Sequence, residues 1–178
     1  MKTHRIGGIT ILTAVVLAMA LLFPLQAAAD EDQVKHPACP YCGMDRTKFA
    51  HSRALITYND GTAVGTCSLH CAAIDLSLKI DKTPVSIEVA DYTTKKLIDA
   101  ENAVWVIGGS KMGVMTRRAK WAFGDKTGAD AFMAANGGSE GEFKVAVRAA
   151  FEDMYADLEM IRAKRKKMRA MKSKMKKD

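Results

Sequence analysis

Two short cysteine motifs constrain the fold of this chain more than any other feature of its sequence. Cys39 and Cys42 form a C-x2-C motif, Cys67 and Cys71 form a C-x3-C motif, and the chain contains no other cysteine. This spacing allows four thiolates to close around one metal ion, provided that the chain folds back between the motifs. Thiolates are soft ligands, which favour Cu(I) or Zn(II) over magnesium or calcium. The motifs therefore predict a protein that handles a metal.

The N-terminus predicts export. Lys2 and Arg5 precede a largely apolar run over residues 9–23, and small alanines follow, ending at Ala29. This order is typical of a signal peptide over residues 1–29, cleaved near Ala29. We therefore expect a periplasmic or otherwise exported protein. A retained N-terminal membrane anchor is the alternative, because the apolar stretch approaches spanning length.

Export gives the cysteines a second interpretation. In an oxidising compartment, four cysteines commonly form two disulfides. The close paired spacing favours metal binding instead, as do Met44 and His70, which lie beside or within the motifs. A disulfide needs neither a thioether nor an imidazole nearby.

The positive charge of the chain is concentrated at its C-terminus. The net charge is +7, yet residues 30–161 hold 15 Lys and Arg against 19 Asp and Glu. Residues 162–178 hold ten basic side chains and one acidic. Such a segment can dock on an acidic partner or an anionic membrane surface, or it can be a solvated and partly disordered end. Nucleic acid is a poor partner for an exported protein.

The pattern along the chain predicts an α+β fold, with two small ββα units forming a pseudo-repeat, followed by a long C-terminal amphipathic helix. We place the units at about 37–92 and 93–138, together a metal-binding domain over 30–138, and the basic, methionine-bearing helix at 139–178. Asn59-Asp60-Gly61 is a strong hairpin turn in the first unit. The expected strands are 53–58, 62–66, 85–92, 103–107 and 120–123, and the expected helices are about 68–80 and 128–136.

Two helical faces are predicted from periodicity. In the helix over 68–80, capped by Ser68, the apolar face contains Leu69, Ala73, Leu76 and Ile80. The last helix is expected to open with a capping box at Ser139 and Glu142. Its seam is expected to include Val147, Phe151, Met154, Leu158, Ile161 and Met168. Residues 140–177 would span about 57 Å as a helix, so its end should project or fray.

Several side chains near the motifs are candidate ligands. Cys67 lies at the start of a predicted helix and Cys71 in its first turn, where the helix dipole favours thiolate. A thioether such as Met44 binds Cu(I) without losing a proton, although it can also fill a gap in the core. His70 is either a ligand or a solvent-facing residue of the first helical turn.

A glycine-rich loop at 108–115 carries two more methionines, Met112 and Met115. Large apolar side chains have little core to join in such a loop. They can complete a Cu(I) site together with Met44, or they can pack on the neighbouring unit.

Five segments in order resemble the NosL family of exported copper-binding accessory proteins, which is related in fold to the organomercurial lyase MerB. The segments are C-P-Y-C-G-M at 39–44, the hairpin at 60–61, D-Y-T-T-K-K-L-I-D-A at 91–100, A-V-W-V-I-G-G-S-K-M-G-V-M at 103–115 and A-D-A-F-M-A-A-N-G-G at 129–138. The resemblance implies Cu(I) binding outside the cytoplasm, in support of copper-site assembly such as that of nitrous-oxide reductase. It also implies copper contacts at Cys42, Met44 and Met115. The second cysteine motif and the basic end lie outside the resemblance.

These observations favour a periplasmic metallochaperone that binds Cu(I) and passes it to a client copper enzyme or copper carrier. The alternative is a structural Zn(II) site of four cysteines in a binding or interaction module. A thiol–disulfide oxidoreductase is disfavoured, because Cys39-x-x-Cys42 opens no βαβ unit. No carboxylate pair, Ser/His/Asp set or phosphate-binding loop indicates an enzyme.

Overall fold

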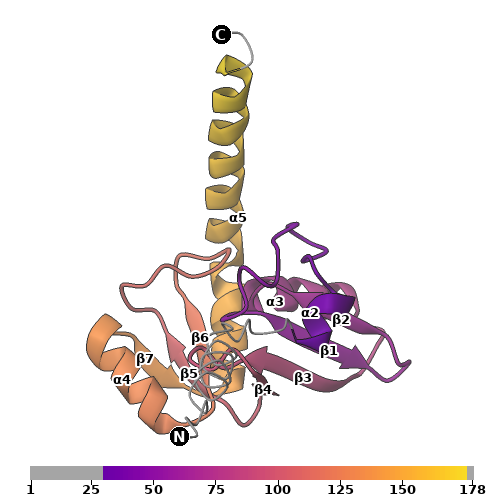
Figure 1. The fold of residues 1–178 in the computed structure, drawn as a ribbon, viewed down its shortest axis with the longest axis vertical. Helices are drawn as coiled ribbons and strands as arrows, with labels where there is room; N and C mark the ends of the chain where they lie inside the picture. Colours follow the sequence, from indigo (N-terminus) through magenta and orange to yellow (C-terminus); the bar gives the residue numbers. More distant parts are fainter. Residues whose placement is uncertain (1–29, 176–178) are drawn as a thin grey trace, which may run out of the picture.

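The computed structural model describes residues 30–175 (Figure 1). The predicted signal peptide and its cleavage site therefore lie outside the described residues. Within 30–175, no helix is both long enough and apolar enough to cross a membrane. The two units lie on either side of the N-terminal half of the long last helix.

The first unit is a four-stranded antiparallel sheet covered by one helix. A short helix, α2 (Glu31–Lys35), leads into it, and the strands have the order β2-β1-β3-β4. Its elements are β1 (Ala54–Tyr58), β2 (Ala63–Thr66), α3 (Leu69–Leu78), β3 (Pro84–Ala90) and β4 (Leu97–Asp99). The turn between β1 and β2 contains Gly61 at a φ of 81°, which is why a glycine suits this hairpin.

The second unit has a three-stranded sheet in the order β6-β5-β7. Its elements are β5 (Val104–Ile107), β6 (Lys120–Phe123), α4 (Lys126–Asn136) and β7 (Ser139–Gly141). Asp125 caps α4, since its carboxylate accepts the N–H of Gly128 at 2.7 Å. The predicted capping box at Ser139 is wrong: Ser139 pairs with Ile107 in the sheet, and the last helix begins after Glu142.

The predicted α+β class, with its two related units and long C-terminal helix, is confirmed. In each unit a hairpin is followed by a helix and then by a strand that pairs antiparallel with the first strand of the hairpin. The repeat is therefore ββαβ. The strand after the helix was expected in the first unit, at 85–92, but not in the second. A parallel bridge between Asp91 and Ala122 joins the two sheets.

The last helix, α5 (Phe143–Lys174), is 32 residues long, about 48 Å. Its buried face consists of Phe143, Ala146, Ala149, Ala150 and Asp157. The predicted seam is wrong at Phe151, which is 45% exposed, because alanines allow α5 to pack closely against α3 and β5. Beyond Ile161 the helix is exposed and projects from the body (Figure 1).

The predicted face of the helix over 68–80 is wrong at one position. Leu69 and Ala73 are buried and Leu76 is half-buried, as expected. Ile80 is 91% exposed, because α3 ends at Leu78 and Ile80 lies in the turn that follows.

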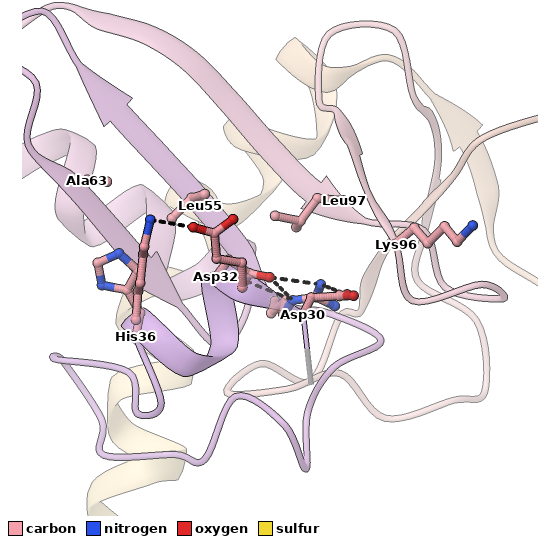
Figure 2. A pocket seen from close by; sticks show the side chains of 10 residues that line it. Asp30, Asp32, His36, Leu55, Ala63, Lys96 and Leu97 are labelled. Carbon is pink, nitrogen blue, oxygen red and sulfur yellow. Dashed lines mark hydrogen bonds and ion pairs between the residues drawn. The ribbon is translucent and has the colours of Figure 1, made fainter. Parts of the chain in front are cut away.

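Buried ion pairs hold the N-terminal segment on the body. Asp32 of α2 accepts hydrogen bonds from Arg46 Nη2 at 2.7 Å and from Arg53 Nε at 3.0 Å, and both guanidinium groups are fully buried. Burial raises the pKa of Asp32, but the two arginines outweigh it and hold the pKa below its ordinary value. The adjoining cavity has a volume of about 440 Å³. Figure 2 shows lining side chains of this cavity, among them Asp32, His36 and Leu97.

Candidate metal centre

The four cysteine sulfurs lie within 4.8 Å of one another. Cys42 Sγ is 3.4 Å from Cys67 Sγ, which is 3.8 Å from Cys71 Sγ. A tetrahedral zinc ion with Zn–S bonds of about 2.3 Å has sulfur–sulfur edges of about 3.8 Å. The donors and their spacing therefore fit one soft metal ion, and all four cysteines are free thiols. Three of the sulfur-bearing residues are buried, and Cys42 is half-buried.

A tight turn directs the first pair of thiols. The N–H of Cys39 donates to the carbonyl of Met44, and the N–H of Gly43 donates to the carbonyl of Cys39, both at 2.8 Å. Gly43 has a φ of 77°, a conformation that side chains disfavour. Arg46 then fixes the end of the turn, because its Nε donates to the carbonyl of Thr66 at 3.0 Å.

The second pair lies where β2 meets α3. Cys67 follows the strand and Cys71 is in the first turn of the helix, as predicted. Ser68 occupies the N-cap position, although its side chain makes no capping hydrogen bond. Ser52 Oγ donates to the carbonyl of Cys67 at 2.8 Å and holds this junction in place.

A carboxylate brace connects the two motifs, and sequence reasoning did not find it. Asp75 of α3 is fully buried and accepts hydrogen bonds from the hydroxyls of Tyr41 and Tyr58, the latter at 2.5 Å. Burial and the hydrogen bond to Asp75 raise the pKa of both tyrosines, which therefore remain donors. Tyr41 lies within the first motif, so the brace fixes that motif to the helix that carries Cys71. An Asp in an otherwise apolar helical segment was the only sequence signal.

The thiols titrate as a group. Hydrogen bonds from the other three thiols lower the pKa of Cys39. Hydrogen bonds to Cys39 and Cys42 raise the pKa of Cys67 and of Cys71, and burial adds to the shift. A metal ion binds thiolates and has to displace any protons that the four thiols carry, so affinity should rise with pH.

His70 does not belong to the four-sulfur group. Its ring is buried, and its Nδ1 lies 3.2 Å from Asp157 Oδ2 on α5. Of the two interpretations of His70, the solvent-facing one is therefore wrong. Burial lowers the pKa of His70, although Asp157 opposes the shift. The structure brings His70 to a contact between α3 and α5.

The predicted methionines do converge on the cysteines. Met44, Met112 and Met115 line a cavity of about 440 Å³ together with Cys42. Met115 has a φ of 64°, a strained conformation for a non-glycine residue of the kind that clusters at functional sites. Two further methionines, both from α5, also line this cavity, which we call the methionine pocket.

The loop that carries Met112 and Met115 is fastened to α5. Arg118 Nε donates to Asp153 at 2.8 Å, and Lys120 Nζ donates to the same carboxylate at 2.5 Å. The N–H of Arg117 donates to Asp157 at 3.1 Å. These contacts fix the loop to the helix, and residues of both segments line the pocket.

Comparison with known proteins identifies a family and a similar solved structure. The NosL family model matches residues 32–150. The crystal structure of the copper chaperone NosL from Shewanella denitrificans is similar with a TM-score of 0.53 and 25% identity, covering 68% of this chain and 96% of that chain. A search among curated proteins returns no match. The family match ends within α5, which leaves the projecting part of the helix outside it.

Proposed function

The chain belongs to the NosL family, and from this we propose that it is a periplasmic Cu(I)-binding protein, a metallochaperone or accessory factor for copper-site assembly. The related structure is titled a copper chaperone, which supports the same role here. The client would be an exported copper enzyme such as nitrous-oxide reductase, or a copper carrier. The role is binding and transfer, not catalysis.

One observation supports this proposal most directly: Cys42 belongs to the four-sulfur group and also lines the methionine pocket. A Cu(I) ion arriving from solvent would thus meet thioethers before it reaches a thiolate. Both donors are soft, and a thioether binds Cu(I) with no proton to lose. An open site of this kind suits transfer, because an incoming ligand can attack before the old one leaves.

In this proposal, Cys42, Met44 and Met115 contact the cargo, and Met112 lies at the opening of the pocket. The other three cysteines complete the four-sulfur group to which Cys42 belongs. The second candidate function is a structural Zn(II) site in an interaction module. It is favoured by the burial of three of the four cysteines and by sulfur spacings that match a closed tetrahedral site.

The setting and partners follow from sequence and charge. Export is proposed from residues 1–29, with a membrane anchor as the alternative. Residues 162–175 are exposed and strongly basic, so we propose that this end of α5 docks on an acidic surface of the client. Binding to the client should then weaken steeply with salt, whereas vesicles of anionic lipid would compete if the end binds membranes instead.

An anaerobic titration tests the function. The reduced chain from Asp30 onward is titrated with Cu(I) and with Zn(II) against chelators, and bound metal is measured by mass spectrometry. We expect tight Cu(I) binding that zinc does not displace. Met44→Leu should weaken Cu(I) binding and leave fold and Zn(II) binding intact. Tight zinc with weak copper would establish the structural site instead.

A further inference from the structure

The methionine pocket has a wall that the family match does not contain. Met160 and Met168 of α5 line the pocket opposite the loop that carries Met112. Both lie beyond residue 150, where the family match ends. We propose that Met160 and Met168 are Cu(I) ligands, so that α5 supplies the entry route by which the ion reaches Cys42. This inference rests on the proposed function and assigns further residues to the same site.

The exposure of these side chains is graded along the pocket. Met168 and Met112 are 60% and 66% exposed, which places them at the mouth. Met160 and Met115 are half-buried, as is Cys42 at the inner end. On α5 the two methionines are two turns apart, about 12 Å along the axis. An ion at the mouth would therefore find successive thioethers on its way to the thiolate.

The position of α5 beside the pocket is fixed by contacts on both sides of it. Arg118 pairs with Asp153 and with Glu152 of α5 at 2.8 and 3.0 Å. Lys164, one helical turn from both methionines, places its Nζ 3.9 Å from Met112 Sδ. The loop and the helix thus meet across the mouth through the residues between Met160 and Met168.

The charges at the mouth favour a monovalent ion. Lys164 and Arg165 line the pocket, and none of the described residues that line it is an Asp or a Glu. Two cationic side chains repel a divalent ion about twice as strongly as a monovalent one at the same distance. Hard cations also prefer the carboxylates that the lining lacks. The wall formed by α5 therefore selects Cu(I) over Zn(II) at the mouth.

The transfer step is ligand exchange with no change of oxidation state. Thioethers bind Cu(I) weakly and have no ionisable proton. Bonds from sulfur to copper at the mouth therefore form and break readily. Cys42 Sγ then replaces a thioether, and any proton on its thiol leaves to solvent as the Cu–S bond forms. The stronger thiolate bond gives the movement its inward direction.

The same helix contains a matched control. Met171 and Met175 lie on the exposed end of α5, 55% and 79% exposed, and do not line the pocket. They share the chemistry and the basic surroundings of Met160 and Met168 without the loop and Cys42 opposite. Simple attraction of copper by a methionine-bearing tail would involve all four methionines, whereas an entry route would involve only the inner two.

Nuclear magnetic resonance provides the direct test. The mature chain is labelled at its methionine methyl carbons and titrated with Ag(I), a redox-stable analogue of Cu(I). We expect the methyl signals of Met160 and Met168 to shift together with those of Met44 and Met115, while the signal of Met171 stays in place. Shifts confined to Met44 and Met115 would overturn the inference and leave the proposed function standing. If no methionine signal shifts, both fail.

Loading rates complete the test. A double variant, Met160→Leu with Met168→Leu, keeps helix propensity and apolar volume, and should take up Cu(I) from its bicinchoninate complex about tenfold more slowly. The matched pair, Met171→Leu with Met175→Leu, should load as fast as the unaltered chain does. Thermal unfolding of the metal-free variants should be unchanged. Equal loading rates of the two double variants would contradict the proposed entry route.

Discussion

Replacing Tyr41 by Phe should separate the stability of the fold from the order of the metal site. The substitution removes only the hydroxyl that donates to the buried carboxylate of Asp75. A hydrogen bond to a charged group contributes about 1.5–3 kcal/mol. Tyr41 is half-buried, so water replaces part of the loss and the lower end applies. Asp75 keeps the hydroxyl of Tyr58 and the ammonium of Lys79, the latter at 3.1 Å.

The effect on metal affinity has a different origin. If the turn at 39–42 stays ordered without the hydroxyl, metal affinity does not change, because the hydrogen bond is missing equally from the metal-free and the metal-bound protein. If the turn becomes disordered, the metal has to order it on binding. The affinity loss then cannot exceed the lost hydrogen bond, which sets a limit of about tenfold. We expect a loss near that limit, since Asp75 is the contact that fixes the turn to α3.

Tyr58→Phe is the matched control. It removes an equivalent hydroxyl from the same carboxylate, but Tyr58 lies on β1, which the sheet holds independently. Urea unfolding of the reduced, metal-free proteins should show about 1.5 kcal/mol lost in Tyr41→Phe, and more in the buried Tyr58→Phe. Chelator competition should show weaker metal binding in Tyr41→Phe only. Equal metal affinities in the two variants would refute the assignment of Tyr41 as a positioning residue.

Three further expectations concern stability. Asp32→Asn should lower the free energy of unfolding by about 3–5 kcal/mol, because Arg46 and Arg53 stay buried without their carboxylate. The pKa of Asp32 is lowered in the fold, so its contribution is present at neutral pH and lost as pH falls through the folded pKa. Urea unfolding from pH 7 to 3 should therefore show a steeper loss of stability in the unaltered chain than in Asp32→Asn. Met115→Gly should relieve a positive φ of 64° but lose the packing of a half-buried side chain, so its unfolding temperature should fall less than that of Met115→Ala, and both variants should bind Cu(I) more weakly. Removing bound metal with a chelator should lower the unfolding temperature in calorimetry, and an unchanged temperature would mean that the four thiols hold no ion.

Local signals predicted the first hairpin, the helices α3 and α4, and the grouping of the cysteines. The turn at 59–61 specifies its own conformation, and the spacing of the two motifs leaves few ways to use four thiols. The third strand of the second unit escaped prediction because Ser139–Gly141 carries no apolar alternation. Its pairing arises from the free edge of β5, a feature of the assembled sheet. The face of α5 was wrong for a related reason, since close packing against α3 favours its alanines over its larger residues.

The candidate site also combines features that the sequence predicts with features that only the fold creates. Spacing predicted the four thiols, and the resemblance pointed to Met44 and Met115. Neither could indicate Met160 or Tyr41, because their roles depend on which segments lie opposite them after folding. Asp75 and α5 are therefore where the structure adds most to the sequence.

Cys42 is more exposed than the other three cysteines, and this bears on whether the protein retains a bound metal ion or transfers it. A metal ion held by Cys39, Cys67 and Cys71 alone would be enclosed, since all three are buried. An incoming ligand can reach such an ion only where a donor faces an opening, and within the described residues that donor is Cys42, which faces the methionine pocket. Exchange should therefore begin at Cys42 whether the ion is copper or zinc. What distinguishes the two metals is the pocket itself, whose thioethers bind a passing Cu(I) ion, whereas its cationic mouth repels Zn(II) more strongly and offers it no carboxylate.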